Sequence, residues 1–318
     1  MSKCDVVIMG GSLAGAACAR ELERQGIEAI AFERDYFPRR KVCGGFLSPG
    51  AVDCIKSLGL LDQVLRAGAV EVTSARVHIG NAQIDVPFER SGLGISRLTL
   101  DEILARSPRV HQGHAVRDVS RLNGGFVVEG IHCAAVVDAS GKLGRFTKRQ
   151  AEPEFGIQYV EPQSQGSVLA FSFFDDGYGG SVSVEGGRSN CCFLIKRDAL
   201  EKYTGRPDCL VTGPLAYDRL PGEFIAIGDA AGMLDPACGD GMRHALETGI
   251  LAARVIAAGV RRRANYDEMK SEYESEWQRR WWLKRAFGAG MRKLLARPAL
   301  FSAAIQIAPA RLVKRLWS

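Results

Sequence analysis

The stretch that decides the fold is Asp5-Val-Val-Ile-Met-Gly-Gly-Ser-Leu-Ala-Gly15, close to the start of the sequence. The β-branched run Asp5–Met9 predicts a short buried strand, and the glycine-rich turn after it leads into a helical stretch, Ala14–Gln25. A second strand, Ile27–Phe32, follows and ends at Glu33. This order of strand, turn, helix and strand within about thirty residues predicts a unit that binds a dinucleotide pyrophosphate at the helix N-terminus.

The small residues of the turn and the acidic residue after it each have a physical role. Gly10 allows the tight turn out of the strand, and Gly15 lets the helix pack close to the strand. Ser12 stands where the fingerprint has its middle glycine and is small enough for a phosphate to approach. Glu33 places a carboxylate where it can accept hydrogen bonds from a ribose and repel a 2′-phosphate. The pattern therefore favours FAD or NAD over NADP.

A second stretch, Arg34-Asp-Tyr-Phe-Pro-Arg-Arg-Lys-Val-Cys-Gly-Gly-Phe-Leu-Ser-Pro49, combines basic residues and glycines. Its basic side chains, Arg39, Arg40 and Lys41, offer positive charge for a pyrophosphate. Its two glycines, Gly44 and Gly45, would let the backbone pass close to a flat ligand.

Two further strands end in small or acidic residues. Ala134–Asp138 is followed by Ala139-Ser-Gly141, and Phe224–Ile227 is followed by Gly228-Asp229. The segment Pro236–Met242 then opens a long predicted helix.

In this order the motifs resemble those of the FAD-dependent oxidoreductase superfamily that contains the aromatic hydroxylases and the geranylgeranyl reductases. The resemblance implies an α/β fold with a three-layer Rossmann-type FAD-binding domain, formed by residues 1–150 and 213–260. It implies a small inserted β-rich substrate lobe with a short sheet at 151–212, and a basic amphipathic helical tail at 261–318. FAD is the implied cofactor. Since no second glycine fingerprint follows a strand, the resemblance implies that a reductant, if used, either visits transiently, as NAD(P)H would, or comes from a partner protein.

The resemblance also assigns roles in cofactor binding. The glycine-rich turn would hold the pyrophosphate, Glu33 the adenosine ribose, and Val116 would lie by the adenine. Asp229 would bind the ribityl chain, and the segment opened by Pro236 would pack at the isoalloxazine. The residues implied to contact FAD are Gly10, Gly11, Ser12, Leu13, Ala14, Gly15, Glu33, Arg34, Arg40, Cys43, Gly44, Arg97, Val116, Ala139, Gly141, Gly228, Asp229, Pro236, Gly239, Asp240, Gly241 and Met242.

Within the superfamily, the pattern Phe37–Pro49 is most similar to the geranylgeranyl reductase branch, although Tyr178–Ser181 lacks the Trp and Pro usual there. We therefore expect an oxidoreductase that transfers a hydride from FAD to a C=C bond of a hydrophobic small molecule. The alternative is a flavin monooxygenase that hydroxylates a phenolic or polyketide substrate. An alternative of another class is a non-catalytic, membrane-associated FAD-binding partner protein. Cys43, as a proton donor or redox thiol, and Tyr178, as a cleft residue, are the candidate catalytic side chains.

Charge is distributed unevenly along the 318 residues, whose formal net charge is +6. The segment Arg279–Ser318 holds ten basic residues and no acidic one, interleaved with aromatic residues, so the rest of the chain is mildly acidic. An acidic body argues against nucleic-acid binding. The tail suits either peripheral contact with an anionic membrane or folding back over the substrate cleft. The sequence leaves the oligomeric state open.

The nine cysteines form neither a Cys-x-x-Cys pair nor a spacing with histidine that would suit a metal. Reduced thiols, a cytoplasmic location with membrane association as an option, and the absence of a metal site are the expectations. Cys191 and Cys192 are adjacent on a predicted strand and are expected to pack on opposite faces. His244, at the start of the long helix, is expected to be solvated.

Overall fold

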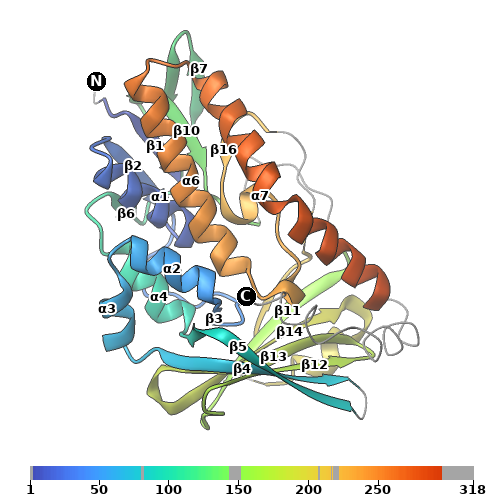
Figure 1. Cartoon of the computed structure of the whole chain (residues 1–318). Helices are drawn as coiled ribbons and strands as arrows, with labels where there is room; N and C mark the ends of the chain where they lie inside the picture. Colours follow the sequence, from blue (N-terminus) through green and yellow to red (C-terminus); the bar gives the residue numbers. More distant parts are fainter. Residues whose placement is uncertain are drawn as a thin grey trace.

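The chain is described here from a computed structural model, which covers residues 3–79, 82–142, 152–206, 208–215, 217 and 222–295. A parallel sheet of five short strands, in the order β16-β10-β1-β2-β6, carries the N-terminal motif (Figure 1). Its strands are β1 (Val6–Met9), β2 (Ala29–Glu33), β6 (Val110–Gln112), β10 (Ala135–Asp138) and β16 (Ile225–Ala226). All four residues of β1 are buried, as a central strand covered on both faces requires.

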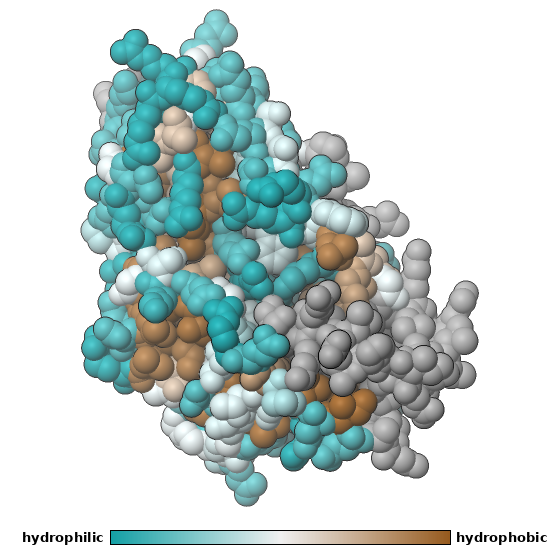
Figure 2. Space-filling view, in the orientation of Figure 1, coloured by the Kyte–Doolittle hydropathy of each residue, from teal (hydrophilic) through white to brown (hydrophobic). Residues whose placement is uncertain are grey.

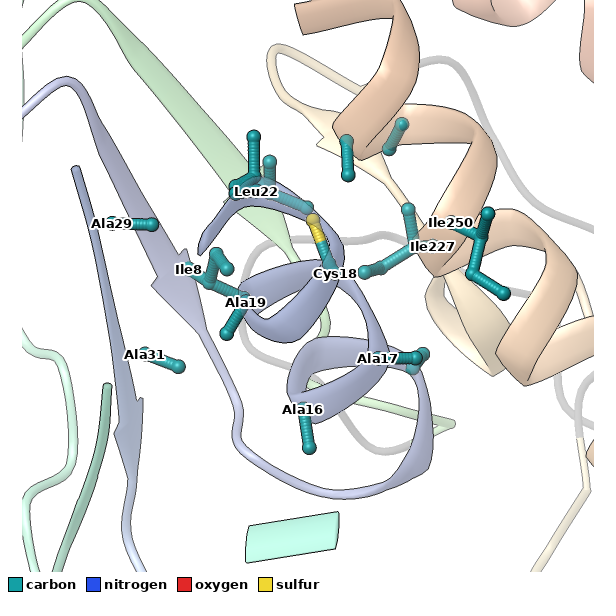
Figure 3. Close-up of a cluster of buried hydrophobic side chains, with 14 of the residues drawn as sticks. Ile8, Ala16, Ala17, Cys18, Ala19, Leu22, Ala29, Ala31, Ile227 and Ile250 are labelled. Atoms are coloured by element: carbon teal, nitrogen blue, oxygen red, sulfur yellow. The ribbon is translucent and has the colours of Figure 1, made fainter. Parts of the chain in front are cut away.

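Helix α1 (Leu13–Arg24) lies between the parallel sheet and helix α6 (Gly241–Arg261), as Figure 3 shows. The α1 face toward the sheet is built from small residues and Leu22, which pack near Ile8. The two helices approach closely, since a Cβ added at Gly249 would lie 2.3 Å from the carbonyl oxygen of Ala14. This close packing fixes where the α1 N-terminus points.

A three-stranded antiparallel sheet supplies the third layer of this domain. It consists of β7 (Val119–Leu122), β8 (Gly125–Val128) and β9 (Ile131–Cys133). Phe126 of β8 belongs to the core of β1 and β10 and meets the ring of Tyr266 edge-on at 4.6 Å. The expected three-layer α/β arrangement is therefore confirmed.

The second sheet has eight strands in the order β15-β11-β14-β13-β12-β4-β5-β3 and lies at the bottom of Figure 1. The prediction that the lobe comprises 151–212 alone was too narrow, because β12 pairs in parallel with β4 from the first third of the chain. The strands are β3 (Phe46–Leu47), β4 (Val70–Ile79), β5 (Ala82–Gly94), β11 (Glu154–Glu161), β12 (Val168–Phe174), β13 (Gly177–Val184), β14 (Arg188–Lys196) and β15 (Leu210–Thr212).

Short helices connect the two sheets. Helices α2 (Pro49–Ser57) and α3 (Leu61–Arg66) follow β3, and α4 (Arg97–Ala105) follows β5. A short helix, α5 (Leu200–Tyr203), follows β14 in the lobe.

The basic tail begins with the long helix α7 (Tyr266–Leu295), which runs along α6 (Figure 1). Its Trp281 is buried, which supports a folded-back helix, whereas the neighbouring Trp282 and Leu283 are 57% and 62% exposed. On the face drawn in Figure 2 the hydrophobic residues form separate areas bordered by hydrophilic ones. Within the described ranges no helix combines the length and apolarity that crossing a membrane requires. Residues 296–318 lie outside these ranges, so membrane contact by the tail stays a prediction.

Candidate active site

A cavity of about 240 Å³ lies where three parallel strands end and the eight-stranded sheet begins. In open α/β sheets, ligands bind beyond the carboxyl ends of the strands. Here β1, β10 and β16 end just before Ser12, Ala139 and Gly228, and all three of these residues line the cavity. The opposite wall comes from the lobe sheet and includes Phe171 and Tyr178. The cavity therefore joins the two parts of the molecule.

Most of the residues predicted for the site come together here although they lie far apart in the sequence. Those that line the cavity are Ser12, Leu13, Ala14, Cys43, Gly44, Arg97, Ala139, Gly141, Tyr178, Gly228, Asp229, Pro236, Gly239, Gly241 and Met242.

The glycine-rich turn prepares the N-terminus of α1 for an anion. Gly10 has φ +116°, and a Cβ added at Gly15 would lie 1.8 Å from the Gly10 carbonyl oxygen. The Ser12 hydroxyl forms no cap with the first turn of α1; instead it donates to Asp101 Oδ2 (3.1 Å) and accepts from Arg97 Nη2 (2.7 Å). The first N–H groups of α1 thus point to the cavity without a side-chain cap, as in phosphate-binding helices.

Arg97 and Asp101 form a buried ion pair one helical turn apart on α4. Arg97 Nε donates to Asp101 Oδ1 (3.0 Å) and Nη2 to Oδ2 (2.8 Å), and the two side chains are 7% and 0% exposed. Burial lowers the pKa of Arg97. The interactions with Asp101 and Cys43 raise this pKa by more than burial lowers it, so it lies above its ordinary value. Arg97 therefore brings a fixed positive charge to the cavity wall.

Among the described lining residues, the other cations are Lys41 and Lys142. Burial, followed by the nearby charge of Arg97, lowers the pKa of Lys41 to about 8, although Asp229 acts in the opposite direction. Burial also lowers the pKa of Lys142. Of the basic run in the second motif, Lys41 is thus the residue that faces the ligand position.

Arg34 and Arg40 were also predicted to contact FAD, and this contact stays a prediction. Both side chains are exposed and neither lines the cavity. Arg34 Nε lies 3.6 Å from Asp35 Oδ2, and Arg40 Nη2 donates to the carbonyl oxygen of Asp208 (3.1 Å). The chain after β2 follows the surface before it reaches the cavity at Lys41, and the Arg34 and Arg40 side chains are exposed.

The charge of Lys41 predicts a pH dependence of FAD affinity. An anionic diphosphate raises the pKa of Lys41, so binding requires proton uptake once the pH exceeds about 8. We expect the dissociation constant for FAD to rise roughly tenfold between pH 7 and pH 9, measured by flavin fluorescence. Lys41→Gln should weaken binding at pH 7 and flatten the profile, whereas the exposed Lys56→Gln should change neither. A flat wild-type profile would contradict this role of Lys41.

Glu33 is buried and holds the turn from the side of β2. Its Oε2 accepts from the Gly11 N–H (2.9 Å) and its Oε1 accepts from the Asp35 N–H (3.1 Å). Glu33, Gly10, Gly11 and Gly15 do not line the cavity but shape the turn beside it. The ribose role of Glu33 stays a prediction.

Val116, predicted to lie by the adenine, is half-buried against the domain core and does not line the cavity. Its predicted contact with the cofactor therefore also stays a prediction.

The loop before α6 carries the flavin-facing positions expected from the sequence. Asp235 caps the short helix η4 (Pro236–Cys238) by accepting from the Ala237 N–H (2.9 Å), and Gly239 then adopts φ +66°. Gly241 and Met242, the first residues of α6, line the cavity.

Asp240, also predicted to contact FAD, does not line the cavity, and its contact with the cofactor stays a prediction. Its carboxylate accepts from the Ser48 hydroxyl (2.6 Å) and pairs with the Lys284 ammonium. Asp240 thereby ties the start of α6 to α2 and α7. The sequence around Asp240 does not distinguish this structural carboxylate from its cavity-lining neighbours.

His244 was expected to be solvated but is fully buried between α6 and α7. Its Nε2 accepts from Trp277 Nε1 (3.1 Å), and the Trp281 ring meets it edge-on with centroids 4.7 Å apart. Burial lowers its pKa to about 4, so the imidazole is neutral. Trp277 and Trp281 lie one helical turn apart and therefore on one face of a helix. This pair was the feature of the sequence that could have predicted a helix packed over His244.

Acid should destabilise the protein through His244. Between pH 6.5 and 4 the unfolded chain binds a proton that folded His244 does not, so the free energy of unfolding falls as the pH drops. We expect this loss to be about 3 kcal/mol at pH 4. Urea titrations of His244→Phe should lack this part of the pH slope, whereas the exposed His111→Gln should keep it. Equal slopes in all three proteins would contradict the assignment.

The lining suits a ligand with a diphosphate and a flat ring. Among the described residues, the lining includes the starts of α1 and α6 and three cations, while Gly44 and Gly241 leave space, since a Cβ at either would meet nothing within 4 Å. The remaining wall is apolar and aromatic. This donor set fits FAD, with the diphosphate at α1 and the ring toward the lobe.

Comparisons with known proteins agree with this geometry. Residues 3–123 match the family described as FAD binding domain. The chain is 26% identical to a menaquinone reductase of Mycobacterium tuberculosis, over 79% of this chain and 76% of that protein. It is 29% identical to a 1H-pyrrole-2-carbonyl-[peptidyl-carrier protein] brominase of Pseudoalteromonas luteoviolacea, over 80% and 78% of the two chains.

A solved structure shares the fold across the whole molecule. PqsL of Pseudomonas aeruginosa, described as a probable FAD-dependent monooxygenase, superposes with a TM-score of 0.80 at 16% identity. The match covers 96% of this chain and 100% of that one. With an FAD-binding domain over residues 3–123 and this cavity beside it, the chain is an FAD-dependent oxidoreductase.

Proposed function

We propose that the protein is a flavin monooxygenase that transfers one oxygen atom from O₂ to a phenolic or polyketide substrate. The observation that carries the proposal is the substrate side of the cavity. Its lining from the lobe strands includes Phe171, Tyr178 and Leu194, and none of the described lobe residues that line it is charged. Such a wall accepts a flat apolar substrate and keeps water from the reacting atoms.

Tyr178 fixes the geometry between this wall and the loop before α6. Its hydroxyl donates to Asp235 Oδ1 (2.5 Å), while the Ala237 N–H donates to the same carboxylate oxygen. Burial, then the nearby Asp235 charge, raises the pKa of Tyr178 well above its ordinary value, so the phenol stays protonated. Its ring lies 5.9 Å from that of Phe171. Tyr178 therefore orients an aromatic substrate, and a direct catalytic role stays a prediction.

The other residues of the site would bind FAD and orient it. FAD, when bound and reduced, supplies the electrons that activate O₂. The N-terminus of α6, with Gly241 and Met242 on the cavity wall, stabilises negative charge on the bound ring. Arg97 and Lys41 neutralise the diphosphate. We found no second nucleotide fingerprint in the sequence, so NAD(P)H would visit as a transient reductant.

Hydride transfer to an isoprenoid C=C bond, as in the geranylgeranyl reductase branch, is the second candidate. The similarity to a menaquinone reductase over most of both chains favours it. So do the cavity thiols Cys43 and Cys192, since burial raises the pKa of Cys192 to about 12 and keeps that proton available. Cys43 would serve as the proton donor in this reaction.

Product masses separate the two reactions. The FAD-loaded protein is supplied with NADPH or NADH under oxygen-18 gas, with phenolic, polyketide and polyprenyl compounds offered in parallel. The proposal predicts a phenolic or polyketide product that carries one oxygen-18 atom. A polyprenyl product that gains two hydrogens and no oxygen-18 would replace it with the reductase. The Tyr178→Phe variant should lower turnover while FAD affinity stays within about twofold of wild type.

A further inference from the structure

Two thiols from different elements, Cys43 and Cys192, line the cavity and interact electrostatically with each other. Cys43 belongs to the segment between β2 and β3, and Cys192 lies on β14 of the lobe sheet. Both line the cavity and both are partly buried free thiols. The neighbouring Cys191 is buried, and as the adjacent strand residue it points to the opposite face of the sheet.

The side-chain amides of two neighbours of Cys192 hold the Cys43 backbone. The Cys43 N–H donates to Gln158 Oε1 (3.0 Å), and its carbonyl oxygen accepts from Asn190 Nδ2 (2.9 Å). Gln158 is the residue paired with Cys192 on the neighbouring strand β11. Asn190 lies two residues before Cys192 on β14 and therefore shares its face. Both anchors of Cys43 thus flank Cys192.

Two cations of the cavity wall interact with Cys43. The Arg97 guanidinium interacts with the Cys43 thiol, and Lys142 interacts electrostatically with both cysteines. Adjacent cations stabilise a thiolate, which is the form that attacks a disulfide. Cys192 has fewer such neighbours and burial raises its pKa, so Cys43 is the thiol that attacks first and Cys192 must lose its proton before it attacks in turn.

We propose that Cys43 and Cys192 form a reversible dithiol–disulfide site that accepts small-molecule disulfides such as glutathione disulfide as oxidants. The Cys43 thiolate attacks one sulfur of glutathione disulfide, which forms a mixed disulfide and releases one glutathione thiolate. Cys192 then loses its proton to water and attacks Cys43 Sγ, which forms the Cys43–Cys192 bond and releases the second glutathione. The two cysteines are oxidised by two electrons, and the glutathione disulfide is reduced by two.

The test equilibrates the full chain, with and without FAD, in glutathione buffers of increasing oxidised fraction. Free thiols are then trapped with N-ethylmaleimide and peptides are identified by mass spectrometry. We expect a peptide joined through Cys43 and Cys192 that disappears when reduced glutathione is added in excess. Cys191→Ser, the matched control one residue away, should still form it. Cys192→Ser should instead accumulate Cys43 with glutathione attached.

Three results would overturn the proposal. In the first, both cysteines remain fully labelled by N-ethylmaleimide in the most oxidising buffer. In the second, wild-type Cys43 carries glutathione but never joins Cys192. In the third, Cys43 joins another cysteine. Thermal unfolding of each serine variant checks that its result does not arise from misfolding.

Discussion

Replacing Gly15 with alanine is expected to abolish FAD binding. The new Cβ would lie 1.8 Å from the carbonyl oxygen of Gly10 and 2.9 Å from its carbonyl carbon, both of which are backbone atoms. To relieve this clash, the turn and the start of α1 must move apart. This movement displaces the N–H groups that face the cavity. Because the obstacle is backbone rather than a flexible side chain, we expect a loss of at least about 3 kcal/mol in unfolding free energy.

Fluorescence titration with FAD and urea unfolding measure the two effects of Gly15→Ala. The matched control is Gly205→Ala, because a Cβ there meets nothing within 4 Å and the residue does not adopt a positive φ. The control should bind FAD like the wild type. Unchanged FAD affinity in Gly15→Ala would mean that the turn is not where the diphosphate binds.

Arg97→Met is expected to lower both stability and FAD affinity. The substitution leaves Asp101, which is fully buried, without its bidentate partner, and breaking such a pair costs about 3 to 5 kcal/mol. It also removes the buried cation nearest to Ser12 at the start of α1. We expect FAD affinity to fall at least about tenfold, since a charge-assisted contact with the cofactor is lost.

A double variant separates the two effects of Arg97. Arg97→Met with Asp101→Leu replaces the ion pair with apolar side chains, so unfolding free energy should recover toward wild type. FAD affinity should stay low, because the cavity still lacks the charge. Arg106→Met, whose pair with Glu102 is on the surface of the same region, should change little. Recovery of FAD binding in the double variant would show that Arg97 acts only through stability.

The sequence predicted the FAD-binding half of the molecule because its motifs are local. Each cofactor segment follows a parallel strand, and parallel strands end at one edge of their sheet, so Ser12, Ala139 and Asp229 had to meet. The lobe was harder, because it depends on pairing between β4 and β12, which are separated by nearly ninety residues. Neither strand alone indicates its partner.

The direction in which individual side chains point was also difficult to predict from the sequence. Arg40 and Lys41 are adjacent and chemically similar, yet only Lys41 enters the cavity. Asp240 lies among cavity residues but turns to Ser48 and Lys284. His244 became buried because α7 covers it, a contact between segments more than thirty residues apart. These outcomes depend on tertiary packing rather than on local pattern.

The most direct test of oxygen transfer is rapid mixing of the reduced, FAD-loaded protein with oxygenated buffer, with and without phenolic or polyketide substrates. Flavin absorbance is followed until the oxidised spectrum returns. The proposed monooxygenase predicts at least two phases, with a transient spectrum distinct from those of reduced and oxidised flavin. A single-phase return to oxidised flavin under every condition, with no dependence on substrate, would contradict the proposal.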